Sequence, residues 1–111
     1  MTYEEIFEKI KKIVLSHNVE DLNNNIAVQI NITGEGEGIF YIALNDGVVS
    51  VEPYTYYDRD CIFIISGKDL LKICEGQLSP IKAFTIGKLK IQGSIEKALE
   101  FSKIIEGVQK D

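Results

Sequence analysis

Large apolar side chains alternate with small or polar ones (Ala27, Gln29 and Asn31) from Ile26 to Ile32, and this pattern constrains the fold more than any other feature of the chain. The large apolar residues are all β-branched, and a period of two places them on one face of an extended strand. A strand with one buried face needs partner strands and a covering layer. The chain therefore has to build a sheet around this segment.

Two turn signals after this strand indicate its next partners. Glycines at positions 34, 36 and 38 end the first strand, and an apolar strand pattern resumes over residues 39–44. Asn45-Asp46-Gly47 tolerates positive φ and is typical of a hairpin turn, so residues 48–52 are expected to return as a third strand. The glycine stretch is interpreted as a turn and not as a phosphate-binding loop, because a strand and not a helix follows it.

Two more strands are predicted in the C-terminal half of the chain. Residues 61–65 form a continuous apolar run, which is typical of a strand covered on both faces. Residues 88–92 alternate lysines with apolar residues, which indicates an edge strand with one exposed face. The irregular residues 53–60 are long enough to carry the chain to a different position in the sheet.

Helical periodicity is found in four other segments. Residues 3–15 have an apolar stripe, and Thr2 followed by Glu5 fits a capping box at the start of this helix. Ser66 and Ser79 each precede a shorter helical segment as N-caps, and a longer helix ends the chain. The predicted order is αβββ followed by βααβα, which is an α+β fold.

Length and charge narrow the functional classes. At 111 residues the chain has the size of one domain, so we predict a single domain over residues 1–111. Acidic residues outnumber basic ones by 17 to 12, which argues against nucleic-acid binding and against stable docking on anionic lipid. The N-terminus is charged, and no apolar stretch reaches the roughly 20 residues of a membrane span, so we expect a cytoplasmic protein.

The residues that could carry chemistry are few. One histidine, His17, and two cysteines cannot supply a four-ligand zinc site, and His17 is the single imidazole base available to a nucleophile. Cys61 and Cys74 lie in apolar segments, where thiols are inert, so we interpret them as packing residues. Acidic residues such as Asp58 and Asp60 lie in a solvated loop and are interpreted as surface groups. We therefore expect no catalytic residues, no metal, no cofactor and no enzymatic activity.

Small residues recur in the C-terminal half where a dense core would need bulk: Ala83, Gly87, Gly93 and Ala98. Helices that cover a sheet without filling the space beneath them leave an apolar cavity, and such cavities bind apolar ligands. Close packing around the small residues is the simpler explanation.

One run of residues in this half spans two helix caps, a turn and a strand: Ser79-Pro80-x-x-Ala83-Phe84-x-x-Gly87-Lys88-Leu89-Lys90-Ile91-x-Gly93, followed by Ala98-Leu99. This run closely resembles the signature of the sterol carrier protein 2 (SCP2) domain family. Residues 60–70 look like the strand and helix that precede the signature in that family. The helix and meander before them fit the same order, so the resemblance covers nearly the whole chain.

The resemblance implies a five-stranded mixed sheet of order 3-2-1-4-5, covered on one face by helices that enclose a hydrophobic tunnel. Family members bind apolar small molecules such as fatty acids, acyl-CoA esters, sterol-like lipids and phospholipids, and they do no chemistry of their own. Ile86 stands where some members carry a polar residue. By position, the resemblance assigns ten ligand-binding residues: Phe63, Ile65, Ile81, Phe84, Ile86, Ile91, Ile95, Ala98, Leu99 and Ser102.

Two functions fit this resemblance. The first is a lipid-binding or lipid-transfer module with an apolar ligand in its tunnel and at most transient membrane contact. The second is a non-catalytic interaction or regulatory subunit whose tunnel is vestigial or filled, acting in a homodimer or with an enzyme partner. A lipid that co-purifies with the chain favours the first, and a stable complex without lipid favours the second.

Overall fold

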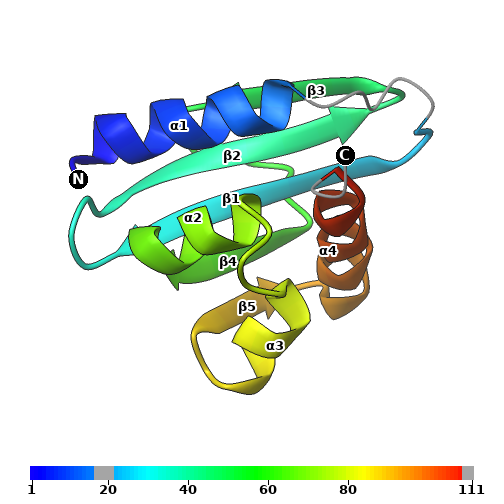
Figure 1. Ribbon diagram of the computed structural model, residues 1–111. Coiled ribbons are helices and arrows are strands. Elements are labelled where there is room, and N and C mark those ends of the chain that lie inside the picture. Colours follow the sequence, from blue (N-terminus) through cyan, green and yellow to red (C-terminus); the bar gives the residue numbers. More distant parts are fainter. Residues whose placement is uncertain (17–21, 109–111) are drawn as a thin grey trace.

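The alternating segment forms β1 (Asn25–Thr33), the central strand of a five-stranded sheet with the order β3-β2-β1-β4-β5 (Figure 1). It pairs antiparallel with β2 (Gly38–Asn45) and parallel with β4 (Cys61–Ser66). β3 (Val48–Glu52) pairs antiparallel with β2, and β5 (Leu89–Gly93) pairs antiparallel with β4. The predicted mixed sheet and its strand order are therefore confirmed, with β5 at one edge.

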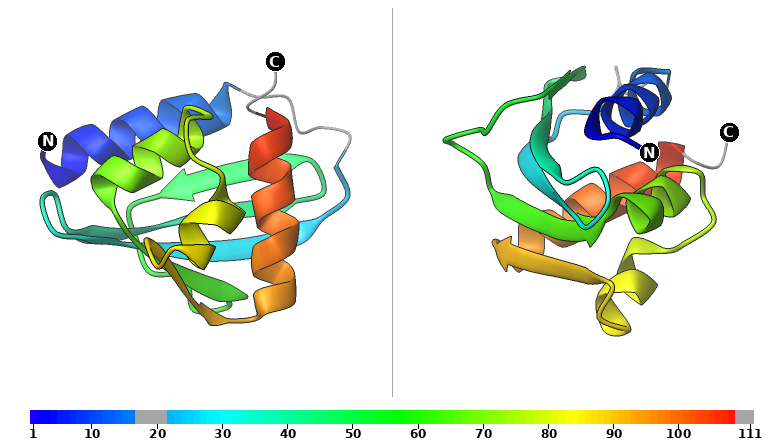
Figure 2. Two further views of the ribbon diagram at one scale, coloured as in Figure 1. Left: turned by 60° about the horizontal axis from the view of Figure 1, so that its bottom comes forward. Right: turned by 90° about the vertical axis from the view of Figure 1, so that its left-hand side faces the viewer.

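The computed structural model describes residues 1–16 and 22–108, with side chains described up to residue 104. Within these ranges the chain forms four helices: α1 (Tyr3–Leu15), α2 (Gly67–Cys74), α3 (Pro80–Thr85) and α4 (Ile95–Val108). Figure 2 shows that the helices lie on one side of the sheet, as expected for an α+β fold.

Local caps explain why the helices begin at their observed positions. The Thr2 hydroxyl accepts a hydrogen bond from the Glu5 amide at 3.2 Å, and the Glu5 carboxylate accepts one from the Thr2 amide at 2.9 Å. The hydroxyls of Ser66, Ser79 and Ser94 each accept a hydrogen bond from the amide three residues further on. These caps satisfy amides that have no partner inside a helix, and three of them were predicted from the sequence.

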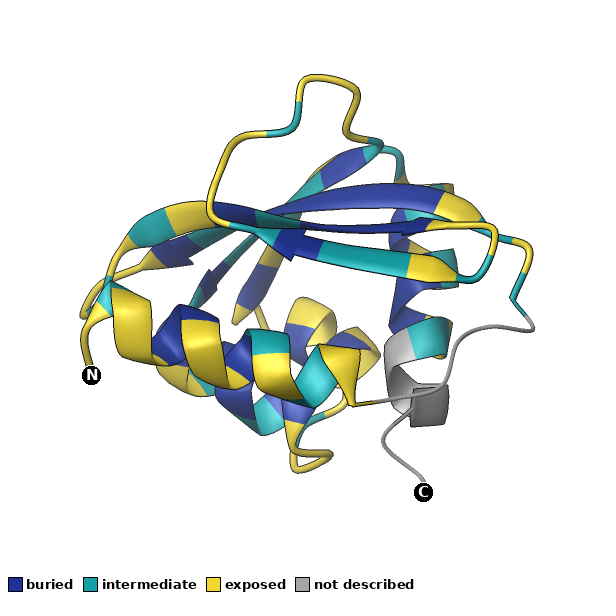
Figure 3. Ribbon diagram, turned by 90° about the horizontal axis from the view of Figure 1, so that it is seen from above, coloured by how far each residue is buried: buried dark blue, intermediate teal, exposed yellow. Residues whose placement is uncertain are grey.

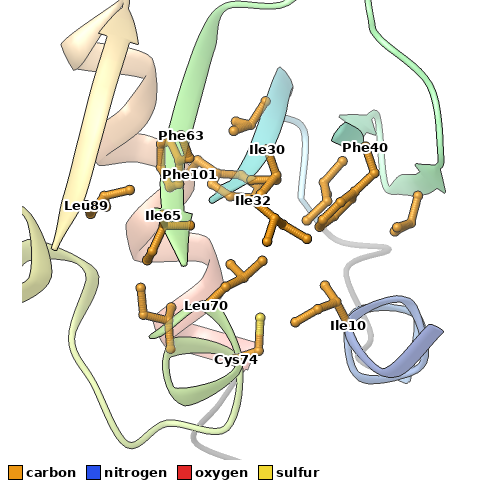
Figure 4. Close-up of a cluster of buried hydrophobic side chains, with 14 of the residues drawn as sticks. Ile10, Ile30, Ile32, Phe40, Phe63, Ile65, Leu70, Cys74, Leu89 and Phe101 are labelled. Carbon is orange, nitrogen blue, oxygen red and sulfur yellow. The ribbon is translucent and has the colours of Figure 1, made fainter. Parts of the chain in front are cut away.

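The core lies between the inner face of the sheet and the helices (Figure 4). Ile30 of β1, Phe40 of β2 and Ile10 of α1 belong to this cluster, and all three are almost completely buried. Phe63 of β4 meets Phe101 of α4 edge to face, with ring centroids 5.6 Å apart. These contacts hold α1 and α4 over opposite halves of the sheet.

The prediction that β4 is covered on both faces is wrong. Its residues alternate between buried and half-buried, and Ile62 and Ile64 lie on the face away from the helices. Their neighbours on β1 are Gln29 and Asn31, so this face of the sheet is mixed in polarity. The largely exposed loop over residues 53–60 projects from this side and leaves these side chains partly accessible (Figure 3).

Candidate functional site

The inner face of β4 and β5 forms an apolar floor at one end of the sheet. Phe63 lies opposite Ile91 and Ile65 lies opposite Leu89 in the antiparallel register. Directly opposite residues of an antiparallel pair project to the same face, so these four side chains form one layer. Phe63, Ile65 and Leu89 are buried, whereas Ile91 is half-buried.

α4 stands against this floor through its small and aromatic residues. Ala98 is fully buried, Ser102 one turn further on is 4% exposed, and Phe101 contacts Phe63. The Ser102 hydroxyl donates a hydrogen bond to the Ala98 carbonyl at 2.9 Å. Because its proton is used inside the helix, this hydroxyl is not a free donor for a ligand.

The two flanks of α4 differ in character. On one flank the Lys97 ammonium approaches the Asn25 carbonyl at 3.4 Å, and the Glu100 carboxylate accepts a hydrogen bond from the Asn24 amide group at 2.6 Å. These contacts fix that flank to the start of β1. Ile95 lies on the other flank, and Leu99, one helical turn further on, borders the same hollow as Asn24 and Glu100; the two side chains are 47% and 45% exposed.

α3 contacts both β5 and α4 and adds three more exposed apolar side chains. Ala83 is fully buried beneath the helix, whereas Ile81, Phe84 and the C-cap residue Ile86 are between 47% and 52% exposed. We call the five half-exposed side chains of α3, its C-cap and α4 the C-terminal apolar face: Ile81, Phe84, Ile86, Ile95 and Leu99.

The structure thus places the ten predicted ligand-binding residues in one region but in different environments. Five form the C-terminal apolar face, four are buried in the floor or under α4, and Ile91 lies between the two groups. Their role in ligand binding stays a prediction. Because Ala83 and Ala98 are completely buried, close packing accounts for these two small residues without a cavity beside them.

Two hollows are lined by described residues. One of about 560 Å³ lies between the start of α1, α2 and the turn that joins β1 to β2. The other, of about 420 Å³, follows α4 and is lined in part by Leu99, Glu100 and Lys103. Leu99 is the one member of the predicted ligand-binding set that lines either hollow, so the tunnel also stays a prediction.

The two thiols are not activated. Burial raises the pKa of Cys61 to about 11 and that of Cys74 to about 12, so both are protonated at neutral pH. Both are free cysteines packed in the core, in agreement with their interpretation from the sequence.

His17 lies outside the described residues. Among the described residues, no three His, Cys, Asp or Glu side chains gather in a group that could hold a metal ion.

The interpretation of Asp60 as a surface group is wrong. Its carboxylate accepts a hydrogen bond from the Ala27 amide at 2.8 Å, and its own amide donates one to the Ala27 carbonyl, also at 2.8 Å. The Asp60 carbonyl accepts a hydrogen bond from Ser94, the cap of α4, at 3.0 Å. One residue therefore joins β1, the start of β4 and the start of α4, and no local sequence pattern signals this.

Phe101 is a second residue that the sequence analysis did not assign to the site. Helical spacing could have identified Phe101, because Phe101 follows the fully buried Ala98 by three positions and so lies on the same face of α4.

None of the helices in the described ranges is both long and apolar enough to cross a membrane.

Comparisons with known proteins agree with this architecture. The model of the SCP-2 sterol transfer family matches residues 3–106. The chain is 34% identical over 102 residues to hydroxysteroid dehydrogenase-like protein 2 of Xenopus laevis, which covers 88% of this chain and 24% of that protein. The chain thus spans about a quarter of the length of this relative.

Two solved structures share the fold over nearly the whole chain. A structure described as "UbiJ-SCP2 Ubiquinone synthesis protein" superposes with a TM-score of 0.74 at 16% identity, over 95% of this chain and 96% of that one. The solution structure of palmitated SCP2L2 from Aedes aegypti gives a TM-score of 0.70 at 21% identity, over 95% of both chains.

Proposed function

The chain belongs to the SCP-2 sterol transfer family, whose members bind or transfer lipids, and on that premise we propose that residues 1–111 act as one lipid-binding domain. The ligand is an apolar small molecule, such as a fatty acid, an acyl-CoA ester, a sterol-like lipid or a phospholipid. Its apolar part lies against the C-terminal apolar face and reaches toward the floor at Ile91.

The observation that carries this proposal is the exposure of five large apolar side chains on α3, its C-cap and α4, beside an apolar floor. Each loses contact with water when an apolar chain covers it, which is favourable by about 25 cal/mol per Å². A 16-carbon chain that buries on the order of 400 Å² gains roughly 10 kcal/mol before the cost of ordering the complex.

We further propose that the chain performs no chemistry itself, since the SCP2 domain is in general a non-catalytic lipid-binding fold. The protonated, buried thiols support this assignment because neither is a nucleophile at neutral pH. Both are free cysteines, the state that a reducing cytoplasm maintains, and we place the protein there.

The test measures binding of a fluorescent fatty acid to delipidated protein; the Aedes aegypti relative, described as palmitated, motivates this choice of probe. A charge in the C-terminal apolar face has to be desolvated when the chain binds, so Phe84→Asp and Leu99→Asp should each weaken binding at least roughly tenfold. Val48→Asp places the same charge at an exposed apolar residue of β3 and serves as the control. Equal affinities in all three variants and the parent would overturn the proposal.

The alternative function is a non-catalytic interaction or regulatory subunit. It is favoured by one observation, that the matched relative is about four times the length of this chain and so carries other segments beside the matched one. Native mass spectrometry of gently purified protein separates the two functions. A bound lipid supports the carrier, whereas a homodimer or a complex with an enzyme, free of lipid, supports the subunit.

A further inference from the structure

We infer that the free edge of β5 binds an extended segment of a partner protein as a sixth strand of the sheet. β5 is the last strand of the order β3-β2-β1-β4-β5, and it pairs with β4 alone. An edge strand presents backbone N–H and C=O groups that its one neighbour does not use, and an added strand can pair with them. Among the described residues, no backbone hydrogen bond joins β5 to any segment except β4.

The two edges of the sheet are not equally accessible. At the other edge, β3 contacts α1, its residue Val51 is 1% exposed, and Pro53 follows directly after the strand. β5 forms the lower border of the sheet in Figure 1, where Lys90 and Gln92 are exposed and Ile91 is half-buried. An extended segment can therefore reach the edge of β5 more easily than that of β3.

The register of β5 determines which side chains an added strand meets. Ile91 lies opposite Phe63 and so projects to the helix side of the sheet, whereas Lys90 lies opposite Ile64 and projects to the other face. Phe63 is 3% exposed, but Ile91 stays half-buried because no strand lies beyond it. An apolar side chain of the added strand would cover Ile91 from the open side, next to α3 and α4, which both contact β5.

The charge around β5 favours an acidic segment. Residues 78–94 contain three lysines, Lys82, Lys88 and Lys90, and no acidic residue, in a chain whose acidic residues outnumber basic ones by 17 to 12. Lys88 pairs with Asp69 at 3.8 Å, whereas Lys90 is exposed and forms no ion pair with a described residue. A carboxylate opposite Lys90 on the added strand is favourable, because opposite charges across a strand pair attract. The partner segment therefore alternates acidic and apolar residues.

The same lysine argues against a second copy of the chain as the occupant. If β5 of two copies paired about a two-fold axis perpendicular to the sheet, both Lys90 side chains would project from the same face of one short ribbon. Like charges this close across a strand pair are unfavourable, and lysines on an edge strand commonly prevent self-pairing. A partner segment that carries carboxylates neutralises Lys90 instead.

The experiment measures, by fluorescence anisotropy, binding of the full chain to a short labelled peptide in which valine and glutamate alternate. The parent protein should bind this peptide, and it should bind a peptide with lysine in place of glutamate at least roughly fivefold more weakly. Lys90→Glu should reverse this preference. Lys68→Glu makes the same charge change at an exposed lysine of α2 and should stay within about twofold of the parent. Equal effects of the two substitutions would overturn the inference.

Two further measurements test strand pairing itself. The glutamate peptide with every amide N-methylated keeps its charge but has no N–H donors, so it should not bind measurably. In an NMR titration with the unmodified peptide, the amide resonances of residues 90–93 should shift, whereas those of β3 should not. Equal binding of the methylated and unmodified peptides would reduce the contact to charge attraction and overturn the inference. Shifts confined to β3, or a homodimer joined through β5, would also overturn it.

Discussion

Replacement of Gly93 by alanine should destabilise the protein through a backbone contact that no side-chain movement can relieve. Gly93 ends β5 and has a φ of +97°, a region that residues with a side chain rarely adopt. A Cβ atom at this position would lie 2.8 Å from the Asp60 carbonyl oxygen and 3.0 Å from the Cys61 Cα. Both of these atoms belong to backbone, so β5 or the start of α4 would have to move.

The magnitude follows from two contributions. The positive φ costs an alanine about 1–2 kcal/mol. Relief of the close contact displaces a packed strand and costs about 1–3 kcal/mol more, as in other overpacked sites. Gly87→Ala is the matched control, because Gly87 also has a positive φ, of +83°, but no atom lies within 4 Å of its added Cβ. Gly87→Ala should therefore lower the free energy of unfolding only by the cost of the positive φ.

Urea unfolding followed by circular dichroism gives the free energy of unfolding of the parent and of both variants, with equal m-values as the check on two-state behaviour. We expect Gly93→Ala to lose about 2–5 kcal/mol and Gly87→Ala about 1–2 kcal/mol. A domain of this size has about 5–15 kcal/mol in total, so the difference is measurable. Equal losses in the two variants would refute the reasoning, because the contact with Asp60 would then carry no energy.

Two further predictions concern Asp60 and the thiols. Asp60→Ala removes the acceptor of the Ala27 amide and should lower the free energy of unfolding, measured in urea, by about 1–3 kcal/mol. Asp60→Asn keeps an acceptor and should lower it less. Equal losses of stability in the two variants would contradict the role of that hydrogen bond. Because the pKa values of Cys61 and Cys74 are raised, the folded state holds the thiol protons more tightly than the unfolded state does. The stability that the protonated thiols contribute is therefore complete below pH 9 and is lost as the pH rises toward 12. At pH 8 a thiol reagent should therefore modify both cysteines only as urea unfolds the protein, and rapid labelling of the native state would contradict their burial.

The elements that depend on neighbouring residues could be predicted from the sequence. The alternation in β1, the Asn45-Asp46-Gly47 turn and the serine caps determine where strands and helices begin, because each acts over a few residues. The order of β3, β2 and β1 follows from the same turns. The remaining strand order and the ten candidate residues came from the family resemblance, not from periodicity.

The environment of each side chain was decided by tertiary packing. The apolar run in β4 predicted two covered faces, but burial depends on what lies across the sheet, and in the described chain the helices gather on one side. Asp60 became a structural residue because the parallel pairing of β1 and β4 brings Ala27 to it from 33 positions away. The sequence alone shows that α3 and α4 carry many apolar residues, but the way these helices pack on β4 and β5 decided which of them are buried, such as Ala83 and Ala98, and which five face water.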